Sequence, residues 1–150
     1  MVDRFERFTL AITEISKYWH KIASAEMEKY GLKGPHAIYL VTMQRYAEGI
    51  TATQLGELCG RDKADVSRAM TMMEKKGLIM RPNGNQNSYR ALLKLTAEGE
   101  KAAKFVQERA TVAVELAGKD LSDDARKIFY DTLEYIASNL QMLGEKGLPQ

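Results

Sequence analysis

Residues 50–81, "ITATQLGELCGRDKADVSRAMTMMEKKGLIMR", contain the pattern that decides the fold. Thr51 and Gln54 have the spacing of a capping box, in which each side chain satisfies a backbone N–H at the start of a helix. The helix that begins there runs through Cys59, after which a glycine interrupts the pattern. The first part of the stretch therefore predicts one short helix with a defined start.

A second helix follows at once. Gly60 can adopt the positive φ that turns the chain, Asp62 can cap a helix over residues 63–76, and Gly77 can close that helix. Together with Gly56, where the two helices would cross, this spacing predicts a helix-turn-helix. An ordinary corner between two helices in any helical protein has the same pattern, so the spacing alone leaves both interpretations open.

The two faces of the predicted helix 63–76 differ in chemistry. At 100° per residue, one apolar arc contains Val66, Ala69, Met70 and Met73. The opposite face contains Ala64, Arg68, Thr71 and Lys75, with Asp65 and Ser67 on its flanks. A helix that enters the major groove of DNA needs small side chains, hydrogen-bonding groups and cations in this kind of arrangement.

A polar hairpin is predicted directly after this helix. Residues 78–81 read as a strand, Asn83-Gly84 as a turn, and residues 89–95 as a returning strand. The tip is polar and basic, with Arg81, Asn83, Asn85, Gln86, Asn87 and Arg90. Such a tip is either a loop of no consequence or a wing that reaches the DNA backbone or minor groove beside the helix.

Both ends of the chain have the pattern of amphipathic helices. Apolar residues recur three and four positions apart at Phe5, Phe8, Ile12, Ile15, Trp19 and Ile22, and again at Phe129, Leu133, Ile136, Leu140 and Leu143. A helix over residues 36–46 follows the first, and Thr96 and Ser122 can cap the last two helices, the first of them over 97–117. Apolar seams of this kind pack on partner helices.

Composition bounds the class of protein. The 150 residues carry a net charge of +2, yet residues 61–94 hold eight basic and three acidic side chains, a local charge of +5. A surface this one-sided favours a polyanionic partner. No apolar run is long enough to cross a membrane, and the first residues lack a signal-peptide pattern, so we expect a cytoplasmic protein that does not interact with membranes.

Residues 50–81, followed by "LLKLTAEGEK" at 92–101, resemble the MarR/SlyA-type winged-helix transcriptional regulators. The likeness lies in the helix-turn-helix, the "EKKGL" junction and the strand-to-helix "LT-x-x-G". It implies a mainly α (α+β) fold: a winged helix-turn-helix lobe over 35–95 with a small β-hairpin wing, and a dimerisation region over 1–30 and 96–145. It also implies a homodimeric repressor of a pseudo-palindromic operator, released by a small ligand or an oxidant.

The resemblance also implies which residues contact double-stranded DNA. By position these are Ala64, Asp65, Ser67 and Arg68, flanked by Lys63 and Thr71. The residue pattern itself adds Lys75 on the exposed helix face and Arg81, Asn83, Asn85 and Arg90 on the wing. Asp65 can accept from a cytosine amino group or serve the first turn of the helix, and we favour the second role. The family usually has an aspartate that braces the wing, and this tip has no acidic residue.

A small aromatic or phenolic effector would bind, by the same resemblance, between the dimerisation helices and the lobe. Trp19, Tyr39 and Met43 are the residues that we expect to line such a pocket, although residues of this type are more often plain core. Cys59 shares an apolar stripe with Leu55 and Leu58, which favours an inert thiol over an oxidation sensor.

Other classes of function have weaker support in the sequence. His20, His36 and Cys59 lack paired-ligand spacing, so we expect no metal site and no cofactor. No nucleophile with a base and no phosphate-binding glycine loop indicates an enzyme. The competing interpretation is a winged helix that only binds proteins. That role requires apolar residues on the exposed face of helix 63–76, where Arg68, Thr71 and Lys75 stand instead, so DNA binding is favoured.

Overall fold

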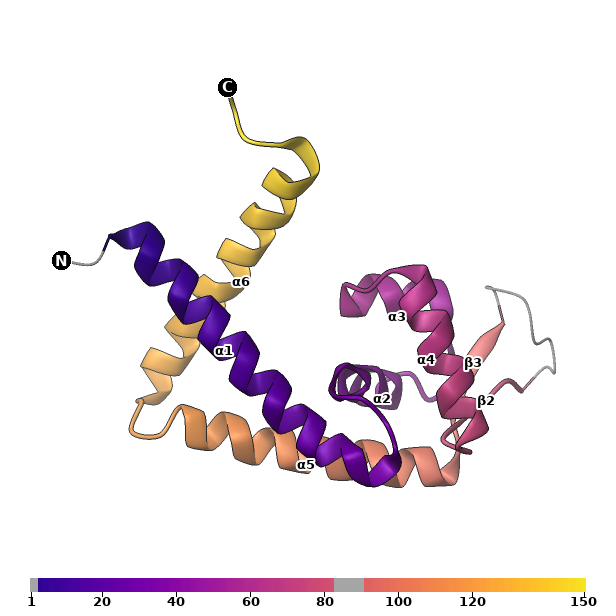
Figure 1. Ribbon diagram of the computed structural model, residues 1–150. Helices are drawn as coiled ribbons and strands as arrows, with labels where there is room; N and C mark the ends of the chain where they lie inside the picture. The colour runs from indigo at the N-terminus through magenta and orange to yellow at the C-terminus, as the bar shows by residue number, and fades with distance from the viewer. Residues whose placement is uncertain (1–2, 83–90) are drawn as a thin grey trace. The chain divides into compact units, whose positions relative to one another are not determined.

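A computed structural model describes residues 3–82 and 91–150 of the chain (Figure 1). The chain divides into two compact units, Met1–Thr111 and Val112–Gln150. The first unit contains α1 (Arg4–Met27), η1 (Glu28–Tyr30), η2 (Gly34–His36), α2 (Ala37–Gln44), β1 (Ile50–Thr51), α3 (Ala52–Cys59), α4 (Lys63–Lys75), β2 (Ile79–Met80), β3 (Leu92–Leu95) and the first part of α5 (Ala97–Ala117). The second contains the end of α5 and α6 (Asp123–Lys146).

The predicted helix starts are confirmed. The Thr51 hydroxyl accepts from the Gln54 N–H at 3.1 Å, and the Gln54 side chain accepts from the Thr51 N–H at 3.1 Å. Single side-chain caps begin the later helices: Asp62 accepts from the Asp65 N–H, Thr96 from the Gly99 N–H and Ser122 from the Ala125 N–H. Local hydrogen bonds of this kind depend only on nearby residues, which is why the sequence predicts them.

The second helix is shorter than the sequence predicts. Residues 36–46 were expected to be helical, whereas α2 covers Ala37–Gln44 and a turn of 3-10 helix, η2, comes before it. Pro35 lies in that turn, where the missing N–H costs no hydrogen bond. A close approach explains the tight turn: a Cβ on Gly34 would lie 2.6 Å from the Ser24 hydroxyl of α1.

The three short strands form an antiparallel sheet in the order β1-β3-β2. Ile79 pairs with Leu95 and Met80 with Lys94, which confirms the base of the predicted hairpin. Strand β1, which the sequence pattern does not predict, pairs with the other edge of β3 through Ile50 and Leu93. The predicted tip, including Tyr89, lies outside the described residues.

A compact core supports α4 within the first unit. Helices α2, α3 and α4 are grouped near the sheet (Figure 1), and Leu55, Val66, Met73 and Leu93 are each at most 1% exposed. The start of α5 is attached to the α4–β2 junction. There, a Cβ on Gly99 would lie 1.9 Å from the Leu78 carbonyl oxygen, so only glycine fits. This contact explains the glycine of the "LT-x-x-G" motif.

The long helices expose their apolar seams. Along α1 the exposed apolar residues are Phe5, Phe8, Ile12, Ile15, Trp19 and Ile22, and along α6 they include Phe129, Leu133 and Leu140. No residue of α6 is buried. Among the described residues, no helix is both long enough and apolar enough to cross a membrane.

Candidate nucleic-acid interface

The two faces of α4 are arranged as the sequence predicts. Val66, Ala69, Met70 and Met73 are buried, each at most 1% exposed. Ala64, Ser67, Arg68, Thr71 and Lys75 are exposed, as is Lys63 at the first position of the helix. The apolar arc thus fixes α4 to the core, and the polar face is left open along the whole helix.

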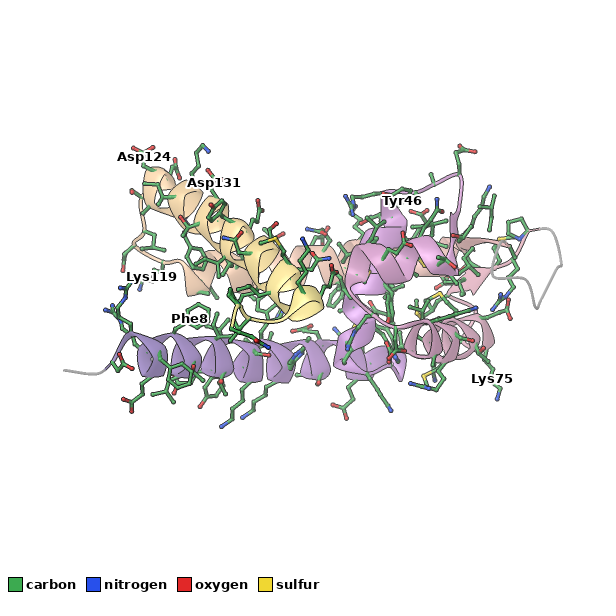
Figure 2. All side chains as sticks on the ribbon, turned by 90° about the horizontal axis from the view of Figure 1, so that it is seen from above. Phe8, Tyr46, Lys75, Lys119, Asp124 and Asp131 are labelled. Carbon is green, nitrogen blue, oxygen red and sulfur yellow. The ribbon has the colours of Figure 1, made fainter. Side chains whose placement is uncertain are left out.

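A shallow groove of about 370 Å³ runs over this open face. Its lining residues are Ser67, Arg68, Thr71, Met72 and Lys75. The hydroxyls can donate and accept hydrogen bonds and the cations can bind phosphate, while no carboxylate lines the groove. Lys75 projects away from its helix at the edge of the molecule in Figure 2.

Two glycines lie at the junction of α3 and α4. A Cβ on Gly56 would lie 3.0 Å from the Arg61 carbonyl oxygen and 3.3 Å from Cγ2 of Val66, so little room is left for a side chain there. Gly60 has φ 64°, a conformation that favours glycine. The spacing of Gly56, Gly60 and Val66 therefore corresponds to a true helix-turn-helix.

Asp65 lies in the first turn of α4, as the sequence favours, but it does not cap the helix. Asp62 caps α4, with its carboxylate 2.7 Å from the Asp65 N–H. The Asp65 carboxylate instead accepts a hydrogen bond from the Tyr39 hydroxyl of α2 and lies 3.8 Å from Nε of Arg61. Tyr39 is 26 residues away in sequence, and nothing in the local pattern predicts the contact.

The electrostatics of this cluster follow from hydrogen bonding and burial. The hydrogen bond from Tyr39, helped by the charges of Arg61 and Arg68, lowers the pKa of Asp65 below its usual value. Burial raises the pKa of the Tyr39 phenol, and the nearby carboxylate raises it further. His36 stacks on Tyr39 with ring centroids 6.2 Å apart, and burial lowers its pKa even though Asp65 acts in the opposite direction.

Arg81 lies at the base of the wing and is braced from α4. Its Nε is 3.1 Å from the Glu74 carboxylate, and its side chain is only 16% exposed. The tip has no acidic residue, but at the base of the hairpin Glu74 of α4 braces Arg81, which directly follows β2. The sequence pattern does not predict this pair. The other predicted wing residues, Asn83, Asn85 and Arg90, lie outside the described residues.

The residues predicted to line a ligand pocket occupy different environments. Tyr39 is 0% and Met43 2% exposed, and both belong to the core of the lobe. Trp19 is 40% exposed on α1. Tyr39 and Met43 are therefore ordinary core residues in this structure.

The single cysteine is half-buried. Its thiol lies 3.5 Å from the Thr42 hydroxyl, to which it can donate. The predicted apolar stripe is only partly correct, because Leu55 is buried and Leu58 is 51% exposed. Over residues 3–82 and 91–150, no three histidine, cysteine or acidic side chains are grouped as metal ligands would be.

Solved structures with the same architecture belong to transcriptional regulators. No family model and no curated protein matches the sequence. A Listeria monocytogenes protein assigned to the MarR family, in complex with 26mer DNA, is 23% identical over 100% of this chain and 99% of that one, with a TM-score of 0.81. Staphylococcus aureus MepR in its DNA complex is 19% identical over 89% and 96%, with a TM-score of 0.77.

A third similar structure holds a small molecule. CouR from Rhodococcus jostii RHA1, bound to p-coumaroyl-CoA, is 19% identical over 87% of this chain and 91% of that one, with a TM-score of 0.74. These identities are too low to transfer a function, but coverage this complete establishes the shared architecture. Together with the helix-turn-helix, the paired β2 and β3 strands and the flanking helices, the similarity shows that this chain has the MarR/SlyA-type winged-helix fold.

Proposed function

We propose that this chain is a cytoplasmic, homodimeric, sequence-specific DNA-binding transcriptional regulator. It represses from a pseudo-palindromic operator, and its two α4 helices read half-sites about one DNA turn apart. The observation that carries the proposal is the open face of α4, which presents hydroxyls and cations over a fully buried apolar face. The fold shared with two DNA-bound proteins supports the same conclusion.

The open face supplies two kinds of DNA contact. Ser67 and Thr71 offer hydroxyls to base edges, and Ala64 leaves room for close approach near the start of the helix. Lys63, Arg68 and Lys75 reach toward phosphates, which fix the position of the helix on the duplex. A module that only binds proteins would expose apolar side chains here, whereas Met72 is the one apolar residue in a groove otherwise lined by Ser67, Arg68, Thr71 and Lys75.

The wing is the second proposed contact. Glu74 holds Arg81 at the base of the hairpin. Arg81, Asn83, Asn85 and Arg90 would then reach the backbone or minor groove beside α4. The local charge of +5 over residues 61–94 is consistent with a polyanionic partner for this surface.

The exposed apolar seams support the proposed dimerisation. Ile15 of α1 is 59% exposed and Phe129 of α6 is 47% exposed, each within a continuous apolar stripe. Monomeric soluble proteins rarely leave such stripes uncovered. We propose that a second copy of the chain covers them, which also places two α4 helices in one molecule.

Release by a small aromatic or phenolic ligand is the remaining part of the proposal. CouR, with p-coumaroyl-CoA bound, has the same architecture. A site that includes Trp19, Tyr39 and Met43 would require the lobe core to open, because two of the three are fully packed. Trp19 is the single tryptophan, so its fluorescence reports ligand binding directly.

Fluorescence anisotropy tests the proposal. The purified protein is titrated against labelled DNA from upstream of its own gene over a salt series, with unrelated DNA as competitor. We expect binding that survives the competitor and tightens as salt falls, because phosphate contacts release counterions. Binding no tighter than to unrelated DNA, or no binding, would reject sequence-specific regulation by this protein alone and favour the protein-interaction module.

A further inference from the structure

Both carboxylates of α4 are held by partners within the chain. Asp65 and Glu74 are the acidic residues of the helix. Asp65 binds the Tyr39 hydroxyl, and Glu74 lies 3.1 Å from Arg81. Arg68 and Lys75, on the open face, form no ion pair with any residue that the structure describes. The helix thus keeps its negative charges occupied and leaves these two cations available.

The Tyr39 hydroxyl reaches Asp65 from the lobe core, whereas Arg61 reaches it at the surface, where the Arg61 and Asp65 side chains are 36% and 32% exposed. Tyr39 is 0% exposed, and its ring is fixed among buried side chains of α2 and its neighbours. Its hydroxyl and Nε of Arg61 approach the same Asp65 oxygen, Oδ2. One hydrogen bond, from α2, and one ion pair, from the turn before α4, therefore hold a single carboxylate.

The position of Asp65 makes this restraint relevant to DNA. Asp65 lies in the first turn of α4, between the exposed residues Ala64 and Ser67. The start of such a helix is where base edges are approached, and a free carboxylate there would repel phosphates. Turned outward, it could also accept from a cytosine amino group and change the sequence preference.

We propose that Tyr39 and Arg61 are positioning residues for DNA binding: they hold the Asp65 carboxylate against the lobe and keep its charge away from the DNA-facing surface. This inference rests on the proposed DNA-binding function. The lowered pKa of Asp65, for which the Tyr39 hydrogen bond is the largest cause, is consistent with the restraint. His36 and Arg68 are the other charged or titratable side chains that act on this carboxylate.

The test uses Tyr39→Phe, which removes one oxygen atom from a packed ring. We expect anisotropy titrations at fixed low salt to show DNA binding weakened by about three- to tenfold, because the freed carboxylate repels phosphate. In an Asp65→Ala background the same substitution should change affinity by less than about twofold, since no carboxylate remains to restrain. Tyr46→Phe, at an exposed tyrosine that follows α2, is the matched control and should bind as the wild type does.

A second measurement does not depend on DNA. NMR titration of the Asp65 carboxyl should show a higher pKa in Tyr39→Phe than in the wild type, and an unchanged pKa would overturn the proposal. Unchanged DNA affinity, or a loss that persists in the Asp65→Ala background, would also overturn it, because packing would then explain Tyr39. In those cases wild-type binding is intact and the proposed function stands. Failure of the wild type to bind any DNA would reject the proposed function and this inference together.

Discussion

Helices α1 and α4 have the same kind of amphipathic pattern, but the apolar face is buried in α4 and exposed in α1. The apolar arc of α4 is buried within its own chain, and Met73 is 0% exposed. The seam of α1 has equally regular spacing, yet Ile15 is 59% exposed. Periodicity therefore shows that a helix has an apolar face, but not whether the same chain supplies the partner for that face.

Within α1 itself, the apolar residues change from exposed in the N-terminal part to buried at the C-terminal end. Its last residue, Met27, is 0% exposed, and η2 packs on the turn near Ser24. Nearby, Arg109 donates to the Glu26 carboxylate at 2.8 Å, and Lys29 lies 3.7 Å above the Phe105 ring. The C-terminal end of α1 and the following η1 are thus fixed to the middle of α5, whereas the N-terminal part of α1 leaves its apolar residues exposed.

The largest expected effect tests the buried core beneath α4. Leu55→Ala removes a fully buried side chain beneath α4, so the free energy of unfolding should fall by about 2–5 kcal/mol. Leu58→Ala, on the same helix but 51% exposed, should stay within about 0.5 kcal/mol of the wild type. Urea denaturation at fixed protein concentration measures both. Equal losses would mean that exposure does not separate the two regions.

The next effect concerns the uncovered seam. Ile15→Glu places a charge in the centre of the α1 stripe and should weaken the proposed dimer by at least about 100-fold, because we propose that a second copy covers this face. Light scattering after size-exclusion chromatography at several concentrations measures the change. Thr13→Glu adds the same charge on the opposite face of α1 and should leave the dimer intact. A dimer that survives Ile15→Glu would remove α1 from the interface.

A smaller effect tests the open face of α4. Arg68→Ala should weaken binding to operator and to unrelated DNA alike, by about three- to tenfold, and should lower the salt slope by about 1, as expected of a phosphate contact. Arg7→Ala removes the same charge from α1 and should not change DNA affinity. A loss confined to one base position would instead make Arg68 a base-reading residue.

Sequence alone predicted the features that depend on near neighbours. The caps at Thr51, Asp62, Thr96 and Ser122 are confirmed because donor and acceptor are three residues apart. The buried arc of α4 is confirmed because a long helix makes the period visible. Local hydrogen bonds and helical periodicity were sufficient for the order of the α-helices and for the two faces of α4.

The features that the sequence did not predict depend on residues far apart in the chain. Strand β1 exists because Ile50 pairs with Leu93, and two residues are too few to show a strand period. The partner of Asp65 is in another helix, and Glu74 meets Arg81 only after the chain has turned at Gly77. A carboxylate on a predicted DNA-facing helix gives no sign in sequence of whether it is free or held, and this contact decides its role.

The smallest expected effect is a pH dependence of stability. It compares the two histidines, because one is buried in the lobe and the other is exposed on α1. His36 is buried beside Tyr39 and accepts the Lys33 N–H through Nδ1, whereas His20 is exposed on α1. Burial lowers the pKa of His36 below its ordinary value of 6.5, so the unfolded chain binds the proton more readily than the folded one. The contribution of His36 to stability should therefore be complete above pH 6.5 and decline as the pH falls toward the folded-state pKa.

Urea midpoints at pH 7.5 and 5.5 should differ less in His36→Asn than in the wild type, and His20→Asn should behave as the wild type. The same pH dependence in all three proteins would show that burial of His36 is not its source.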